Sequence, residues 1–293
     1  MPDASLIIAT HNRARELSDC LAALAWQSQP EQFEVIVVDN GSHDQTQEVI
    51  AAHASDRLRG VFVADPNRAK ARNAGIAQAR GRIVIFCDDD TIAPNNFVAE
   101  HLRAHHDSAR PAVVSGPIVN VPDKDHLVAP AARHYSRAFF CTCNVSVPKA
   151  DLEAVGGFDE RYDLYGWEDT DVGLRLRSRD LARVFAWPAY IYHVKPPRAV
   201  TLERRRALAV EKGTMAARFI RKAPTWAVRL ATGAYGANFA RAAIVNARPL
   251  RTLYERLALS ARPGSFVHVF ASEALVDAAY LDALRSALRR AEC

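Results

Sequence analysis

The chain has 293 residues, of which 49% are hydrophobic and 24% are charged, a composition typical of globular proteins and unlike that of disordered or fibrous chains. No uninterrupted apolar stretch reaches the ~20 residues of a membrane span, and the N-terminus lacks a signal-peptide pattern, so we expect a cytoplasmic protein. The net charge of +5 combines two unequal parts: residues 1–194 hold 20 Lys and Arg against 26 Asp and Glu, and residues 195–293 hold 18 against 7.

Apolar runs and amphipathic segments alternate along the first 115 residues. Runs rich in Val, Ile and Leu predict buried strands at 5–9, 34–38, 58–63, 82–86 and 112–115. Apolar residues at helical spacing predict helices at 13–27, 46–53, 69–80 and 94–106. This strand–helix alternation predicts an α/β fold with a doubly wound, mostly parallel sheet.

The pattern changes after residue 120. We expect an extended segment at 139–147, helices at 149–155 and 170–179, and strands at 183–187 and 190–194. Beyond Pro196 the chain turns helical and basic. That region fits a peripheral contact with an anionic membrane or acceptor, or a solvated helix face, and we expect no nucleic acid partner. Trp26 and Trp187 are interpreted as core residues, and the cysteines Cys141 and Cys143 as packing residues.

Polar side chains stand where three of the predicted strands end. Thr10 follows the first strand, Asp39 the second, and Asp88 opens a triplet of carboxylates after the fourth. Ligands of open α/β sheets bind at these carboxyl ends, so one crevice can collect all three positions. The Asp39 carboxylate can accept an N–H of a nucleobase, or it can cap the turn that follows it.

The triplet Asp88, Asp89 and Asp90 is the most informative feature of the chain. Three adjacent carboxylates repel one another unless a positive charge lies among them. A divalent cation that carries a phosphate-bearing substrate meets this need, because hard cations take oxygen ligands. The alternative interpretation is a solvated acidic turn. The triplet therefore predicts a site for Mn2+ or Mg2+.

A second acidic cluster lies at residues 166–171, with the sequence Gly-Trp-Glu-Asp-Thr-Asp. With this cluster the chain resembles the inverting nucleotide-sugar glycosyltransferases of family 2, which have the GT-A fold. The resemblance covers roughly residues 4–194. It is carried by ordered sequence blocks at 5–13, 34–42, 71–75, 88–90 and 166–169.

The resemblance implies roles for the first blocks in binding the nucleotide sugar. Thr10, His11 and Asp39 would line the base pocket. Arg72 would lie on a helix that faces the nucleotide, where its guanidinium suits a diphosphate.

The same resemblance implies a metal site. Asp88 and Asp90 match the outer positions of the family's DXD signature, with Asp89 between them in the donor site. Asp90 would coordinate the metal most directly, and Asp88 would lean toward the ribose or the metal. His193 lies where many GT-A enzymes carry a late metal-ligating histidine; the alternative is a hydrogen-bonded histidine at a strand end.

The second cluster is expected to supply the base, because an inverting displacement needs one group to take the proton of the acceptor hydroxyl. By resemblance Asp169 is that base, Glu168 binds the sugar or the acceptor, and Trp167 lies beside the sugar. The choice between Glu168 and Asp169 stays open, since adjacent carboxylates titrate together. Asp171 is expected to cap the helix that follows.

The expected organisation has three parts: a nucleotide-sugar-binding half at 1–120, an acceptor-binding half at 121–200, and a basic helical region at 201–293. The expected function is metal-dependent transfer of a sugar from a nucleoside diphosphate, UDP foremost, to an unidentified hydroxyl acceptor in glycan, polysaccharide or glycolipid synthesis. One alternative is a nucleotidyltransferase, although the glycine-rich loop of such enzymes is missing from residues 9–13. Another is an inactive nucleotide-sugar-binding scaffold, which the intact carboxylates count against.

Overall fold

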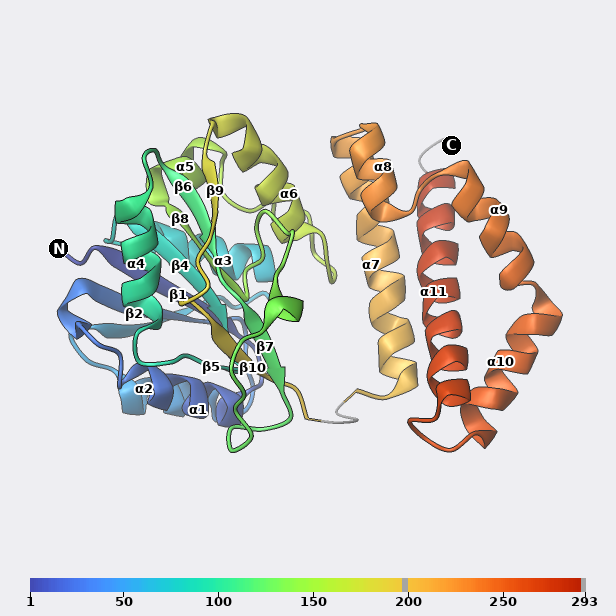
Figure 1. Ribbon diagram of the computed structural model, residues 1–293, viewed down its shortest axis with the longest axis horizontal. Helices are drawn as coiled ribbons and strands as arrows, with labels where there is room; N and C mark the ends of the chain where they lie inside the picture. Colours follow the sequence, from blue (N-terminus) through green and yellow to red (C-terminus); the bar gives the residue numbers. More distant parts are fainter. Residues whose placement is uncertain (197–199, 291–293) are drawn as a thin grey trace. The chain divides into compact units, whose positions relative to one another are not determined.

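The computed structural model describes residues 1–196 and 200–290, and the chain divides into two compact units. The sheet unit comprises Met1–Asp163 and Glu168–Pro197. The helical unit comprises Leu164–Trp167 and Arg198–Cys293. Figure 1 traces the chain through both units and labels their helices and strands.

A seven-stranded sheet forms the centre of the sheet unit. In spatial order its strands are β3 (Leu58–Phe62), β2 (Phe33–Asp39), β1 (Ala4–Thr10), β4 (Ile83–Asp88), β8 (Asn144–Pro148), β6 (Ala112–Ser115) and β9 (Ala182–Phe185). The first four strands are mutually parallel, and β8 runs antiparallel to both β4 and β6. The predicted mostly parallel sheet is confirmed. The predicted extension of the eighth strand back to residue 139 is wrong, because the strand begins at Asn144.

Helices cover both faces of this sheet. One face packs against α1 (Ala14–Leu24), α2 (Thr46–His53) and α4 (Phe97–Asp107), and the other against α3 (Arg68–Gln78), α5 (Lys149–Ala154) and α6 (Glu168–Leu176). Within β1, Leu6 and Ile8 face the first group while Ile7 faces the second, as the period of two in a strand requires. Burying each such side chain contributes about 1.5–3 kcal/mol, so these two apolar clusters fix the sheet's register.

The sheet unit also contains a smaller sheet of three strands, in the order β5 (Thr91–Ile92), β10 (Ile191–Val194) and β7 (Ile118–Val121). Strand β10 is antiparallel to β5, with His193 opposite Thr91. Because Thr91 directly follows the carboxylate triplet, this pairing brings His193 from about a hundred residues away to the triplet. Short 3-10 turns complete the unit, at Pro30–Gln32, Ala132–His134 and Arg177–Arg179.

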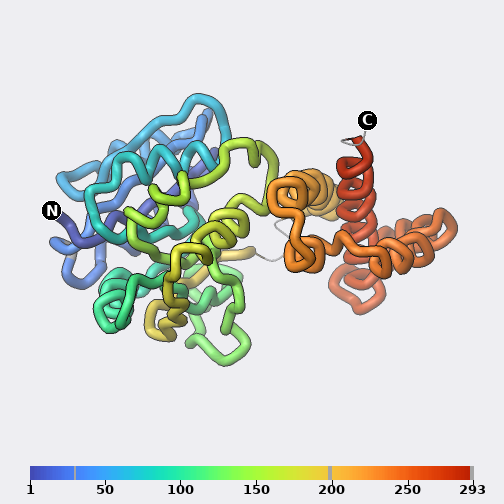
Figure 2. Tube along the Cα trace, turned by 90° about the horizontal axis from the view of Figure 1, so that it is seen from above, coloured from blue at the N-terminus to red at the C-terminus, as the bar shows by residue number. Residues whose placement is uncertain are grey.

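The helical unit contains α7 (Leu202–Lys222), α8 (Trp226–Thr232), α9 (Gly236–Val245), α10 (Arg248–Ser260) and α11 (Phe266–Arg289). Helices α7 and α11 lie side by side (Figures 1 and 2). Gly213 lets them approach closely, since a Cβ at this position would stand 2.3 Å from the carbonyl oxygen of Tyr280. The predicted helical C-terminal region is confirmed. None of the helices in the described ranges 1–196 and 200–290 is long and apolar enough to cross a membrane.

The two tryptophans interpreted as core residues are not buried. The Trp26 side chain is 82% exposed and that of Trp187 is 43% exposed. Trp26 lies beyond the last residue of α1, so it does not continue that helix's buried stripe. Trp187 instead joins a surface cluster, where it stacks on Tyr135 and meets Phe185 edge to face.

Candidate active site

The carboxyl ends of β2, β1 and β4 lie next to one another. Thr10 is the register partner of Asp39, and Ala9 is the partner of Asp88. Parallel pairing therefore gathers the polar positions that follow these strands along one edge of the sheet, as the sequence predicts.

Asp39 is buried and its two carboxylate oxygens differ. Oδ1 accepts the backbone N–H of Ser42 at 2.9 Å and so caps the turn that follows β2. Oδ2 is also buried, yet it has no hydrogen-bond partner within the described part of the chain. The capping interpretation of Asp39 thus holds for Oδ1, and the contact of Oδ2 with a nucleobase stays a prediction. His11 is tied to the same turn, with Nδ1 2.7 Å from the carbonyl oxygen of Asn40.

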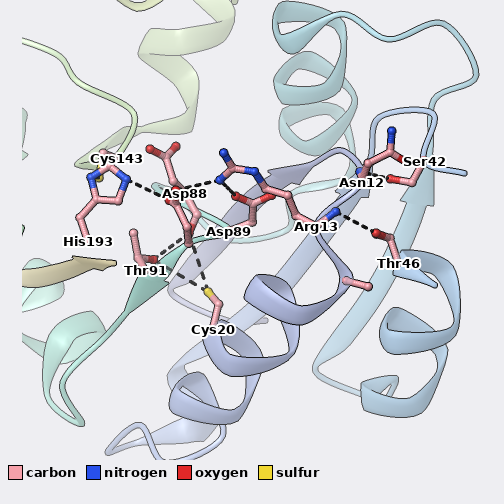
Figure 3. A network of polar contacts seen from close by, with 12 residues as sticks. Asn12, Arg13, Cys20, Ser42, Thr46, Asp88, Asp89, Thr91, Cys143 and His193 are labelled. Carbon is pink, nitrogen blue, oxygen red and sulfur yellow. Dashed lines mark hydrogen bonds and ion pairs between the residues drawn. The ribbon is translucent and has the colours of Figure 1, made fainter. Parts of the chain in front are cut away.

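Arg13 lies against the carboxylate triplet. Its Nη1 is 3.0 Å from Oδ1 of Asp89 (Figure 3). The same atom is 2.7 Å from Oδ2 of Asp90. Burial raises the pKa of Asp89 to about 6 despite the neighbouring guanidinium. Burial alone would raise the pKa of Asp90 as well, but His193 and Arg13 lower it to about 2. Sequence reasoning missed this arginine, although it lies three residues after the end of β1.

His193 stands between two groups at the triplet. Its Nε2 is 3.0 Å from Oδ1 of Asp90, and its Nδ1 is 3.7 Å from Sγ of Cys143. One donor atom each from Asp88, Cys143 and His193 lies within 4.8 Å of the others. Carboxylate and imidazole donors grouped in this way fit a divalent cation. The histidine predicted from the sequence therefore does meet the triplet, together with a cysteine that was not expected there.

Arg72 is held in place by the start of its helix. Asn67 caps α3, because its side chain accepts the backbone N–H of Lys70 at 3.0 Å. One turn later, Arg72 donates from Nη1 to Oε1 of Glu168 at 3.1 Å and lies over the ring of Phe158.

The charge of Arg72 links the two acidic clusters. Burial alone would lower the pKa of Arg72, but the carboxylates of Glu168, Asp88 and Asp169 raise it. The other oxygen of Glu168, Oε2, is buried and has no hydrogen-bond partner among the described residues. Arg72 thus contacts a carboxylate of the second cluster, and its contact with a diphosphate stays a prediction.

Asp169 is the second residue of α6, which begins at Glu168, two residues before the predicted start at residue 170. Its Oδ1 accepts the N–H of Thr170 at 2.7 Å. Burial, reinforced by the charge of Glu168 and opposed by Arg72, raises the pKa of Asp169 to about 6. A carboxylate with this pKa is mostly ionised at pH 7 and is a better proton acceptor than an ordinary aspartate.

The structure contradicts the predicted role of Asp171 and does not test that of Trp167. Asp171 lies inside α6 rather than at its cap, where Oδ2 receives hydrogen bonds from Nε and Nη2 of Arg175 at 3.0 and 2.7 Å, so the capping prediction is wrong. Trp167 has a φ of +76° and belongs to the helical unit. Its indole stacks on Phe219 and donates to the carbonyl oxygen of Lys212 at 3.0 Å. These are packing contacts, and the predicted place of Trp167 beside a sugar remains a prediction.

The glycine pair before Phe158 is clamped by Asn73 of α3. The Asn73 side chain donates to the Phe158 carbonyl oxygen at 2.9 Å and accepts its N–H at 2.8 Å. Gly157 has a φ of +62°, and a Cβ there would stand 2.6 Å from Oδ1 of Asn73. The sequence blocks at 71–75 and 156–158 therefore support each other, and together they hold the ring on which Arg72 lies.

Comparison with known proteins identifies the family. The sequence profile described as "Glycosyl transferase family 2" matches residues 5–159, more than half of the chain. The chain belongs to glycosyl transferase family 2. A second profile, described as "N-terminal domain of galactosyltransferase", matches residues 126–197. This family membership confirms the resemblance and counts against the nucleotidyltransferase alternative.

The curated relatives of this family 2 chain include glycosyltransferases that are longer than the region they share with it. It is 32% identical over 223 residues to validoxylamine A glucosyltransferase of Streptomyces hygroscopicus subsp. limoneus, covering 62% of this chain and 49% of the relative. It is 28% identical over 240 residues to the uncharacterized glycosyltransferase YfnE of Bacillus subtilis, covering 61% of each protein. The chain spans about half the length of the validoxylamine glucosyltransferases that it matches.

Solved structures confirm the predicted GT-A fold. The mannosyltransferase PcManGT from Pyrobaculum calidifontis, in complex with GDP-Man and Mn2+, matches all of this chain and 88% of its own, with a TM-score of 0.64 and 19% identity. TarS 1-349 of S. aureus, in complex with UDP-GlcNAc, matches all of this chain and 92% of its own, with a TM-score of 0.59 and 18% identity. At these identities the likeness concerns the fold of this family 2 member.

Proposed function

We propose that this family 2 member transfers a sugar from a nucleoside-diphosphate sugar to an acceptor hydroxyl with inversion at the anomeric carbon. The main observation in support is a pair of buried carboxylate oxygens, Oδ2 of Asp39 and Oε2 of Glu168. Neither has a hydrogen-bond partner within the part of the chain that the structure describes. A buried acceptor without a donor costs about 1–3 kcal/mol, and the N–H and O–H groups of a nucleotide sugar would supply the donors.

The donor half is assigned to residues 1–120. Thr10, His11 and Asp39 bind the base, with Oδ2 of Asp39 accepting an imide N–H, which favours uracil and hence a UDP-linked sugar. Arg72 binds toward the diphosphate, Asp88 leans toward the ribose or the metal, and Asp89 lies between them in the donor site. The nucleotide sugars in the PcManGT and TarS structures, GDP-Man and UDP-GlcNAc, support a donor of this class.

The metal is assigned to Asp88, Asp90 and His193, which would hold Mn2+ or Mg2+. The Mn2+ in the PcManGT structure supports a divalent cation. When bound, the cation neutralises charge on the leaving diphosphate. Arg13 already compensates Asp89 and Asp90, so the site keeps a positive partner before the donor arrives.

The transfer itself is a single displacement. The acceptor hydroxyl oxygen forms a bond to the anomeric carbon on the face opposite the diphosphate. The bond from that carbon to the diphosphate oxygen breaks, and its electron pair leaves with the diphosphate. The hydroxyl proton passes to the carboxylate of Asp169, whose raised pKa of about 6 suits it as an acceptor. Glu168, held by Arg72, orients the sugar or the acceptor and is the alternative base.

The acceptor half is assigned to residues 121–200, with Trp167 beside the sugar, and residues 201–293 are assigned a peripheral contact with anionic membrane. Large apolar side chains in the helical unit support this contact: Phe266 is 83% exposed, and Leu259 and Phe270 are exposed as well. The exposed arginines Arg256 and Arg262 lie among them in the sequence. Apolar side chains flanked by cations fit an anionic lipid surface. Such a contact would bring the enzyme to a lipid-linked or polysaccharide acceptor.

A donor panel tests the function. The purified full chain is incubated with Mn2+ and with UDP-linked and GDP-linked hexoses, and release of the nucleoside diphosphate is measured with and without excess chelator. We expect release from a UDP-linked donor that the chelator abolishes. Release that persists in chelator would refute the metal assignment, and binding of donors without any release, even with a panel of acceptors, would favour the inactive scaffold.

A further inference from the structure

Cys143 reaches the metal-binding carboxylates through the register of β8. This strand pairs antiparallel with β4, and Asn144 is the partner of Cys87. The residue before Asn144 therefore falls beside the residue after Cys87, which places Cys143 next to Asp88. The Cys143 side chain is 6% exposed.

The sulfur of Cys143 lies close to other donor atoms. This Sγ is 3.7 Å from Nδ1 of His193, and one ligand atom each from Asp88, Cys143 and His193 lies within 4.8 Å of the others. Figure 3 shows His193 and Cys143 on one side of Asp88 and Arg13 on the other. Three donors of different chemistry, from β4, from β10 and from just before β8, thus converge on one point.

We propose that Cys143 is a direct ligand of the divalent cation through its thiolate, together with Asp88 and Nδ1 of His193. The cation site of this enzyme is then a mixed oxygen, nitrogen and sulfur site that favours Mn2+ and softer cations over Mg2+. This inference rests on the proposed metal-dependent function and adds both a ligand and a selectivity to it.

The orientation of His193 supports the use of Nδ1. Its Nε2 is already engaged at 3.0 Å by Oδ1 of Asp90, whose other oxygen is held by Arg13. A carboxylate on one ring nitrogen commonly orients the other nitrogen toward a metal. Here that other nitrogen points to the Cys143 side. Asp90, which is already assigned to the cation, would also fix the imidazole.

The sulfur donor sets the selectivity. Mg2+ takes hard oxygen ligands in a near-ideal octahedron, whereas thiolates select softer ions. On binding, the Cys143 thiol gives its proton to solvent, and the Sγ electron pair forms the bond to the cation. No oxidant or reductant is needed, since neither the sulfur nor the cation changes oxidation state.

Cobalt titration tests the proposal on the full chain. Metal-free protein is titrated with Co2+, and the near-ultraviolet thiolate-to-cobalt charge-transfer band and the Co2+ affinity are measured for wild type and for Cys143→Ser. Cys141→Ser is the matched control, because Cys141 lies two residues away in the same segment and outside the three-donor group. Circular dichroism establishes that both variants fold.

We expect the band in wild type and in Cys141→Ser, and its loss in Cys143→Ser with Co2+ binding weakened about tenfold or more. Mg2+ affinity, measured by competition, should change much less. Co2+ binding to wild type without the band, or a band that survives in Cys143→Ser, would overturn the role of Cys143 and leave the proposed function standing. If folded wild type binds no divalent cation even with UDP present, both the ligand assignment and the metal-dependent function fail.

Discussion

The two compact units of this chain use charge in opposite ways. In the sheet unit, which lies within the acidic first two thirds of the chain, carboxylates converge where strands or helices begin and end: Asp89 and Glu168 are buried, and Asp88 and Asp90 are half-buried. In the helical unit the acids lie on the surface, paired with arginines, as Arg205 with Glu273. Burying like charges together costs folding free energy, so the first arrangement points to a ligand, while the second is that of a solvated surface.

The apolar residues differ in the opposite sense. The sheet unit buries large side chains on both faces of its sheet, including Phe86, Phe97 and Phe158. The helical unit brings two helices together over Gly213 and leaves Phe266 and Leu259 exposed. We therefore assign the chemistry to the strand ends of the first unit and surface attachment to the second. If this division of roles is correct, substitutions in the two units should have different effects.

The largest effect is expected at the carboxylate triplet, to which we assign the metal. Asp90→Ala should abolish detectable turnover, because it removes a cation ligand and the partner of both His193 and Arg13. Turnover is measured as release of the nucleoside diphosphate. Asp65→Ala is the control, since the Asp65 carboxylate is exposed in the same unit. Full activity of Asp90→Ala would show that the buried triplet does not serve a metal.

The next effect concerns the base. Asp169→Asn should lower transfer by roughly a hundredfold or more, the usual contribution of general base catalysis, while donor and metal affinity persist. Glu168→Gln should change sugar or acceptor binding as well as rate, because it alters the contact with Arg72. Separate measurement of kcat and KM distinguishes the two variants.

The pH profile gives a second readout of this prediction. The raised pKa of Asp169 means that the carboxylate is protonated below about pH 6 and cannot accept the acceptor's proton there. The transfer rate should therefore rise as pH increases through about 6 and level off above 7. The residual rate of Asp169→Asn should lack this limb. A wild-type limb near pH 4 would contradict the assigned base.

A smaller effect is expected at the base pocket. Asp39→Ala should weaken binding of UDP by roughly 1.5–3 kcal/mol, the value of one hydrogen bond to a charged group. Calorimetry measures the affinity, and thermal unfolding controls for the lost turn cap at Ser42. Unchanged UDP affinity in a folded variant would remove Asp39 from the nucleotide site.

The smallest effect separates the helical unit from the catalytic one. Wild type should bind vesicles that contain anionic lipid, more weakly as salt rises, and the double variant Leu259→Ser, Phe266→Ser should bind less. With a water-soluble acceptor, the release of nucleoside diphosphate from the donor should be the same for wild type and the variant. Equal vesicle binding by wild type and the variant would leave the exposed helices as a solvated surface.

The sequence predicts most of the sheet because its strands are long apolar runs. Residues 34–38, for example, lie in a strand that is buried along its whole length, and their Val and Ile residues favour a strand. Strands β5 and β7 escaped prediction, since two and four residues carry too little periodicity. Trp26 was misjudged because helix ends are poorly marked when no cap is present.

Strand ends point to part of the candidate site, whereas Arg72, Asp169 and His193 were named only by resemblance to the family. Asp39 and Asp88 are found from the strands that precede them. Arg13 and Cys143 acquire their meaning from partners 76 residues and 50 residues away in the chain, which local patterns do not encode. The register of β8 against β4 is needed to bring Cys143 to the triplet.

The central claim is a single displacement carried out at the strand ends of the sheet unit. Its most direct test is the anomeric configuration of the product. Proton NMR monitors this configuration during transfer from an α-linked nucleotide sugar in the presence of Mn2+. We predict that the β-linked product forms first and exclusively. Formation of the α-linked product would contradict the single displacement and with it the roles of Asp169 and Glu168.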